Sequence, residues 1–244
     1  MENIPAPVLE ATGVCKAFGG LTVLDRLDFV VEAGGIRCLI GPNGSGKSTL
    51  LKAIAGLHRP DTGEIKLSGI RIDGLRPFQV VRSGVSMKFQ IASVLRELTV
   101  YQNIRIPAQR VDDPNRPRSE RIEALLDLVG LAGHRDTIAG TLSHGQQQWL
   151  EIGMAIATEP RLLLLDEPTA GMTPNETRHT AEIVLRLNRE RGIATVIVEH
   201  DMSFVRHLGR RVSVLHQGRI FFEGDIDQVS ANPEVARIYF GGRR

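Results

Sequence analysis

The chain has 244 residues, 42% of them apolar, which is enough for one large domain with a buried core. Its 30 Lys and Arg against 28 Asp and Glu leave a net charge of +2 with both signs interspersed, so the charge predicts no nucleic-acid partner. Two cysteines cannot build a disulfide framework, no segment approaches the ~20 apolar residues of a membrane helix, and we expect no signal peptide at the acidic, proline-containing start. These features exclude secreted disulfide proteins, membrane-spanning proteins and disordered chains.

Aliphatic runs alternate with helical patterns along the chain, which predicts a mostly parallel sheet covered by helices. The expected strands are residues 36–40, 161–165 and 193–198, with a hairpin formed by residues 212–215 and 220–223. A helix is expected over residues 47–55, with Gly56 at its end. The fold class indicated is α/β.

The middle of the chain has a helical pattern of its own. Thr99 and Gln102 have the spacing of a capping box, and Pro107 is expected to end or kink the helix that they begin. Residues 111–117 contain two prolines and several charges, which indicates a connector. Ser119 is then expected to cap a second helix.

Residues 41–48 match the pattern G-x-x-x-x-G-K-[ST] between a predicted strand and a predicted helix. Glycines there let the backbone wrap around a phosphate, and the helix adds unpaired N–H groups and the positive end of its dipole. Lys47 is expected to neutralise the β- and γ-phosphates, and the Ser48 hydroxyl to complete a Mg²⁺ shell. The alternative is a chance match, which the strand and helix context disfavours. The predicted nucleotide-binding residues here are Gly41, Pro42, Asn43, Gly44, Ser45, Gly46, Lys47, Ser48 and Thr49.

Two carboxylates directly follow the apolar run of residues 162–165. The carboxyl ends of strands are where ligands of open parallel sheets bind. Asp166 is expected to hold Mg²⁺, usually through water, and Glu167 to polarise the attacking water as a general base. The alternative is a pair of solvated carboxylates, for which a position next to a buried strand is poorly suited.

Residues 142–146, Leu-Ser-His-Gly-Gln, resemble the LSGGQ signature of the ATP-binding subunits of ABC transporters. Other elements of that family lie in the expected order, and the resemblance spans nearly the whole chain. Phe18 matches the aromatic residue that stacks on adenine. Gln90 matches the Q-loop glutamine, which senses Mg²⁺ and water and meets the membrane partner. His200 matches the switch histidine that contacts the γ-phosphate.

The resemblance implies a site that two subunits share. Two ATP molecules are sandwiched in such a dimer, each between one phosphate loop and the partner's signature. Ser143 and Gln146 also have capping-box spacing, so Ser143 is expected to begin a helix whose exposed N–H groups suit a γ-phosphate. The structural alternative is a helix that is merely capped. The signature residues assigned to nucleotide binding are Ser143, His144, Gly145 and Gln146.

The resemblance also implies the architecture. We expect a P-loop NTPase core of the ABC ATPase type, with a mostly parallel sheet, an antiparallel β portion and an inserted helical subdomain. A single ATP-binding domain is expected over residues 1–244. Its core comprises residues 1–90 and 141–244, and the helical subdomain lies at approximately 91–140.

Two departures from the family pattern indicate a branch. His144 replaces the first glycine of the signature, so its side chain is expected either to point outward or to make a pH-sensitive contact across the dimer. Residues 169–174, Thr-Ala-Gly-Met-Thr-Pro, replace a stretch whose aspartate makes a standard inter-subunit contact. Both departures resemble the branch that imports branched-chain amino acids, urea and short amides. Residues 142–154 look closest to the urea-importer ATP-binding subunit, and residues 199–205 and 232–241 are similar to the same branch.

The function implied is that of an ATP-binding and ATP-hydrolysing importer subunit, with ATP and Mg²⁺ bound, that powers uptake of urea, a short amide or a branched-chain amino acid. The expected partners are a second ATP-binding subunit (identical or a sibling), transmembrane permease subunits and, indirectly, a solute-binding protein. The expected location is the cytoplasmic face of the inner membrane. One alternative is a non-transport ABC ATPase, such as an iron–sulfur assembly ATPase, against which the two departures argue. A P-loop kinase or GTPase would leave the signature unexplained.

Overall fold

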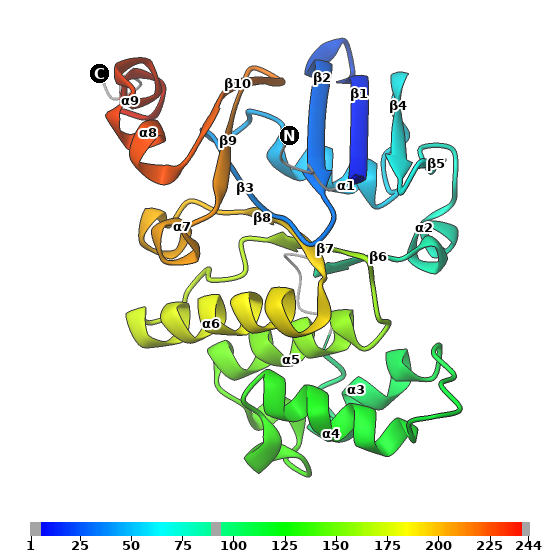
Figure 1. The fold of residues 1–244 in the computed structure, drawn as a ribbon. Coiled ribbons are helices and arrows are strands. Elements are labelled where there is room, and N and C mark those ends of the chain that lie inside the picture. Colours follow the sequence, from blue (N-terminus) through cyan, green and yellow to red (C-terminus); the bar gives the residue numbers. More distant parts are fainter. Residues whose placement is uncertain (1–5, 89–93, 241–244) are drawn as a thin grey trace.

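The computed structural model describes residues 6–88 and 94–240, whose strands form two sheets (Figure 1). The smaller sheet contains, in spatial order, β2 (Leu21–Glu32), β1 (Pro7–Phe18), β4 (Thr62–Leu67) and β5 (Ile70–Arg71). The larger sheet contains, in spatial order, β10 (Arg219–Gly224), β9 (Arg211–His216), β3 (Ile36–Ile40), β8 (Ala194–Val198), β7 (Leu162–Asp166) and β6 (Val85–Lys88).

The strand directions confirm the predicted fold class. All neighbours from β9 to β6 run parallel, β10 pairs antiparallel with β9, and the smaller sheet is antiparallel. Every residue of β3, β7 and β8 is buried, as short apolar runs covered on both faces predict. The predicted strands are found within one residue of their expected bounds, and Gln217 and Gly218 form the turn of the predicted hairpin.

The helices include both predicted capping boxes. They are α1 (Lys47–Ile54), α2 (Pro77–Ser83), α3 (Val100–Ala108), α4 (Arg118–Leu128), α5 (His144–Ile156), α6 (Pro174–Arg191), α7 (Met202–Leu208), α8 (Ile226–Ala231) and α9 (Pro233–Phe240). Thr99 and Ser143 cap α3 and α5 as expected, and α3 ends one residue after Pro107. Within residues 6–88 and 94–240, none of these helices has the length and apolarity needed to cross a bilayer.

The prediction that Ser119 caps α4 is wrong. The N-cap is Pro117, so α4 begins at Arg118 and Ser119 lies inside its first turn. A proline is tolerated at a helix start because its missing N–H would have no partner there. Glu120 in the same turn interacts favourably with the positive end of the helix dipole. The proline and Glu120 therefore both favour a helix that begins at Arg118 rather than after Ser119.

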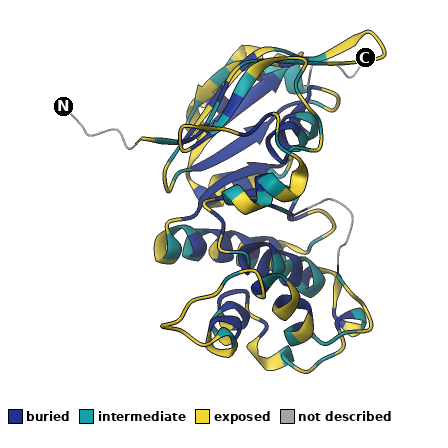
Figure 2. Ribbon diagram, turned by 90° about the vertical axis from the view of Figure 1, so that its right-hand side faces the viewer, coloured by how far each residue is buried: buried dark blue, intermediate teal, exposed yellow. Residues whose placement is uncertain are grey.

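Two apolar layers lie on opposite faces of the larger sheet. One lies between the two sheets and encloses α1, whose Leu50, Leu51 and Ile54 are fully buried. The other lies between the larger sheet and the helices from α3 to α7, of which Figure 1 shows α3 to α6 gathered below the strands. Buried residues accordingly run along the strands and the inward helix faces, with exposed residues on the outer faces and turns (Figure 2). This layering brings the start of α1 to the carboxyl edge of the larger sheet.

A buried ion pair joins the larger sheet to the helical layer. The Nζ of Lys88, the last residue of β6, lies 3.4 Å from Oε2 of Glu151 on α5, and both side chains are 2% exposed. Burial lowers the pKa of Lys88, while the carboxylates of Glu151, Asp166 and Glu199 oppose that shift. Lys88 therefore supplies positive charge beside several buried acids.

Candidate functional site

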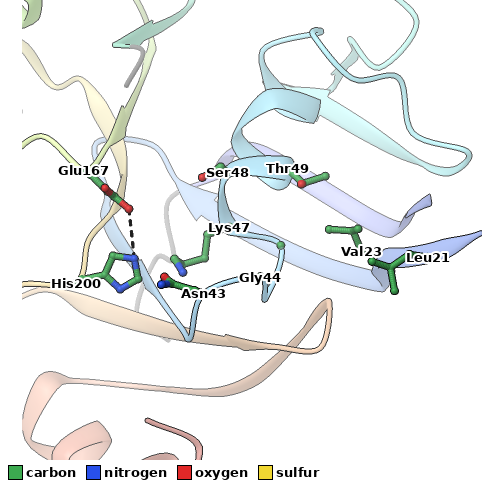
Figure 3. Close-up of a pocket in the computed structure, with 10 residues that line it drawn as sticks. Leu21, Val23, Asn43, Gly44, Lys47, Ser48, Thr49, Glu167 and His200 are labelled. Carbon is green, nitrogen blue, oxygen red and sulfur yellow. Dashed lines mark ion pairs between the residues drawn. The ribbon is translucent and has the colours of Figure 1, made fainter. Parts of the chain in front are cut away.

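A cavity of about 320 Å³ lies at the carboxyl edge of the larger sheet. Its walls come from β2, from the phosphate loop (residues 41–48) with the start of α1, and from the segments that follow β7 and β8 (Figure 3). The residues that line it are Leu21, Val23, Asn43, Gly44, Gly46, Lys47, Ser48, Thr49, Glu167 and His200. The structure thus brings the predicted phosphate loop together with the predicted Glu167 and His200.

The phosphate loop passes very close to both sheets. A Cβ atom at Gly41 would overlap the carbonyl oxygen of Leu215 in β9. One at Gly46 would lie 2.8 Å from the carbonyl oxygen of Val23 in β2. Side chains at these positions would push the loop away from the strands, so glycine is required by the close approach of backbone to backbone.

Lys47 extends back over the phosphate loop. Its Nζ donates hydrogen bonds to the carbonyl oxygens of Gly41, at 2.8 Å, and Pro42, at 3.0 Å. Burial lowers the pKa of Lys47, and the carboxylates of Glu167 and Asp166 oppose that shift. A phosphate is a stronger partner for an ammonium group than neutral carbonyls, so the cavity is suited to an anionic ligand.

Ser48 and Asp166 together fit a Mg²⁺ ion. The Ser48 hydroxyl donates to Oδ1 of Asp166 at 3.4 Å. Burial raises the pKa of Asp166, and the Glu167 carboxylate adds to that shift, so a cation beside Asp166 would be stabilising. Hydroxyl and carboxylate oxygens are ligands that Mg²⁺ accepts, with water and phosphate completing its shell. No cluster of three or more His, Cys, Asp or Glu side chains arranged to hold a metal occurs in the described part of the chain.

Replacing Asp166 with Asn is expected to stabilise the nucleotide-free protein at neutral pH. Because the pKa of Asp166 is raised in the folded chain, folding favours its protonated form, and stability falls as the pH rises from the ordinary aspartate pKa through the raised one. At pH 7.5 the charged group is therefore destabilising. Thermal unfolding should show a higher Tm for Asp166→Asn without ligand, and a loss of the further stabilisation that MgATP gives the parent.

The matched control is Asp136→Asn, because Asp136 is exposed and lies outside the cavity lining. That variant should keep the full MgATP shift in Tm. A ligand-free Tm of Asp166→Asn at or below the parental value would contradict the stability prediction. An undiminished MgATP shift would contradict the Mg²⁺ assignment.

Glu167 and His200 contact each other on one side of the cavity. Oε1 of Glu167 lies 3.3 Å from Nε2 of His200 (Figure 3). Glu167 has a φ of 49°, a left-handed conformation that is uncommon outside glycine. Its N–H donates to the carbonyl oxygen of Val198 at 2.9 Å, so the β8 backbone supports the turn that aims the carboxylate at the cavity. Strain of this kind often occurs at functional sites.

Glu199 is a supporting residue that the sequence analysis missed. It is 3% exposed, and its Oε1 accepts hydrogen bonds from the N–H of Thr169, at 2.9 Å, and its hydroxyl, at 2.6 Å. Its Oε2 accepts from the N–H of His200 at 3.0 Å. The Glu199 carboxylate therefore binds both the turn after Glu167 and the segment that carries His200. No spacing in the sequence predicts the contact between Glu199 and Thr169, because these two residues are about thirty positions apart.

Other predicted residues lie away from this cavity or outside the residues that the structure describes. Phe18 lies at the end of β1, outside the lining, where the residue is 42% exposed and its ring is edge-on to His58 at a centroid distance of 5.2 Å. Leu21 and Val23, which the sequence analysis did not select, form the β2 wall instead. Gln90 falls in residues 89–93, outside the described residues.

The signature residues begin α5 and also lie outside the cavity lining. Ser143 accepts a hydrogen bond from the N–H of Gln146 at 3.2 Å, and the Gln146 side chain accepts from the N–H of Ser143 at 3.0 Å. Nε2 of His144 lies 3.0 Å from the carbonyl oxygen of Ala170, in the turn after Glu167. A Cβ atom at Gly145 would overlap the Glu176 carboxyl group. The start of α5 is thus packed against the segment that leads into α6.

Comparison with known proteins gives a consistent result. The family model described as ABC transporter matches residues 24–170. The high-affinity branched-chain amino acid transport ATP-binding proteins BraF of Pseudomonas aeruginosa and LivG of Escherichia coli K12 are 34% and 32% identical, each over 96% of this chain and 98% of its own length. The methionine import ATP-binding protein MetN of Leifsonia xyli is 36% identical over 96% of this chain and 71% of its own.

Solved structures with the same fold include two cassettes in different states. An ATP-binding cassette of an ABC transporter in its ADP conformation is 31% identical, with a TM-score of 0.86 over 97% of this chain and 99% of the other. A dimeric cassette in a post-hydrolysis state, bound to ADP and phosphate, is 26% identical, with a TM-score of 0.78 over 89% and 98%.

Proposed function

Since the chain belongs to the ABC transporter family as an ATP-binding protein and ATPase, we propose that ATP hydrolysis in the cavity at the carboxyl edge of its larger sheet powers the import of a small polar solute. The observation that carries this proposal is the meeting of the phosphate loop with Glu167 and His200 in one cavity. A phosphate-binding wall and a carboxylate facing it are the two parts that ATP hydrolysis requires.

The proposed reaction assigns one role to each group. Lys47 and the N–H groups of the phosphate loop bind the phosphates of ATP. Ser48 and Asp166 would hold Mg²⁺, which supplies charge neutralisation at the phosphates. Glu167 accepts a proton from water as the water oxygen attacks the γ-phosphorus. The bond between the γ-phosphorus and the ADP oxygen breaks, which gives ADP and phosphate. His200 orients the Glu167 carboxylate and contacts the γ-phosphate.

The position of the signature outside the cavity supports a site shared between two subunits. In this proposal Ser143, His144, Gly145 and Gln146 bind the nucleotide held by a second ATP-binding subunit, identical or a sibling. The similar cassette that was solved as a dimer with ADP and phosphate supports the same arrangement. ATP then closes the dimer and hydrolysis reopens it.

The proposed output of this cycle is movement of permease subunits. The helical subdomain at about residues 91–140 and the segment around Gln90 pass the motion from the core, residues 1–90 and 141–244, to the transmembrane partners. The chain then works at the cytoplasmic face of the inner membrane, and a solute-binding protein supplies the solute indirectly. Phe18 stacks on the adenine in this arrangement.

The solute that we propose is a branched-chain amino acid, or else urea or a short amide. BraF and LivG, whose names state branched-chain amino acid transport, support the first. The similarity of residues 142–154 to the urea-importer ATP-binding subunit supports the second. Overall identity does not choose between solutes, because a methionine import protein is 36% identical. The contacts that select a solute belong to other subunits.

Uptake in the native cells tests the proposal and the solute together. The chain is replaced by Glu167→Gln, and uptake of labelled urea and labelled leucine is measured. Selective loss of urea uptake, or of leucine uptake, would support import and identify the solute class. Glu120→Gln is the control, because Glu120 lies exposed in the first turn of α4. Retention of both uptakes would contradict both proposed solutes and favour the non-transport alternative.

A further inference from the structure

The turn over residues 167–172 is held together by its own backbone. The N–H of Ala170 donates to the carbonyl oxygen of Glu167 at 3.2 Å, and the N–H of Met172 donates to that of Thr169 at 3.1 Å. Thr169 also binds the buried Glu199 carboxylate. Glu167, the first residue of this turn, is therefore joined by a backbone hydrogen bond to the peptide that follows it.

His144 holds the opposite side of this turn. Its Nε2 lies 3.0 Å from the carbonyl oxygen of Ala170, the residue whose N–H binds Glu167. A carbonyl oxygen only accepts hydrogen bonds, so Nε2 must carry the hydrogen. Both the imidazolium ion and one neutral tautomer meet that requirement, so the contact does not depend on the charge of the ring.

The turn has the shape that the histidine ring needs. Gly171 has a φ of +74°, and a Cβ atom there would lie 3.3 Å from Nε2 of His144. The chain thus passes beside the ring at a glycine, where no side chain presses on it. The two departures from the family pattern, the histidine at 144 and the Ala-Gly pair in the turn, contact each other directly. The glycine leaves room for the histidine ring, and the ring binds the turn that contains the glycine.

We propose that His144 is a positioning residue that holds Glu167 in its catalytic orientation. The contacts form a continuous series from His144 to Ala170, from Ala170 to Glu167, and from Glu167 to His200. His144 stands at the start of α5, which in the proposed function faces the nucleotide of the second subunit. The arrangement of one subunit's signature is therefore transmitted to the carboxylate that acts on its own ATP. This inference rests on the proposed role of Glu167.

Two substitutions of similar length separate this role from simple packing. Gln places an amide N–H near the position of Nε2, whereas Met has similar length and no donor. In the purified full-length chain, His144→Met should lower kcat about 3- to 10-fold, the effect of losing one hydrogen bond in the reacting state. His144→Gln should stay within about 2-fold of the parent. The Tm should be unchanged in both, because His144 is not part of the apolar core.

Equal kcat values for His144→Met and the parent would overturn the inference. So would a parallel loss of kcat and Tm in both variants, since that pattern belongs to a packing role without a need for the donor. The proposed function has a separate test in the same preparations. An inactive parent chain, or a Glu167→Gln variant with normal turnover, would contradict the role of Glu167 whatever the His144 variants do.

Discussion

Glu167→Gln is expected to bind ATP like the parent and to lose turnover by a factor of about 10² to 10⁴, the usual contribution of a general base. Gln has nearly the same shape, but its neutral amide cannot take the proton from the attacking water. The left-handed φ at this position and the hydrogen bond to Val198 are backbone features, so the variant retains the turn. Phosphate release measures turnover, and a fluorescent ATP analogue measures binding.

The control for this prediction is Glu120→Gln, which changes the same functional group on the surface of α4 and should match the parent in both assays. Normal phosphate release by Glu167→Gln in a pure preparation would refute Glu167 as the base. Loss of ATP binding by the variant would instead place Glu167 among the binding groups.

Lys88→Met is expected to lower the free energy of unfolding by about 3–5 kcal/mol, the usual effect of removing one member of a buried ion pair. Glu151 is 2% exposed beside it, so its carboxylate loses the neighbouring ammonium group in a buried environment. The double variant Lys88→Met/Glu151→Leu should regain most of the loss, because an apolar pair of similar volume is often as stable as a buried ion pair. Urea denaturation monitored by circular dichroism measures these free energies.

Lys66→Met provides the matched control, because Lys66 pairs with Glu64 at the surface, where both side chains are 36% exposed. Exposed pairs contribute little to stability, so this variant should unfold nearly as the parent does. A Lys88→Met variant that behaves like Lys66→Met would show that the buried pair is not needed for stability. A double variant no more stable than Lys88→Met would contradict the stated cause.

Local patterns predicted much of the fold. Short apolar runs marked β3, β7 and β8, because strands covered on both faces must be apolar throughout. Capping-box spacing marked the starts of α3 and α5, because both partners of that contact lie within four residues. The long strands β1 and β2 were harder to predict one by one. Their pairing contains several register shifts, which interrupt the alternation of buried and exposed residues.

The candidate site was predictable where one short segment carries the chemistry. The phosphate loop, Asp166 and Glu167 each stand directly beside a recognisable strand. The supporting contacts of Glu199 with Thr169 and of His144 with Ala170 were not predictable, since each joins segments 26 to 30 residues apart. Burial of Lys88 was equally hidden, because a lysine at the end of a strand ordinarily reaches water.

The tight seating of the phosphate loop has a consequence for how the free energy of nucleotide binding is used. Gly41 and Gly46 hold the loop against β9 and β2 so closely that the backbone has little space in which to rearrange. A loop already in its binding shape loses little conformational entropy when a phosphate arrives. In the proposed function, the free energy of ATP binding therefore remains available for work at a distance from the loop, in bringing subunits together and moving the partners that they drive.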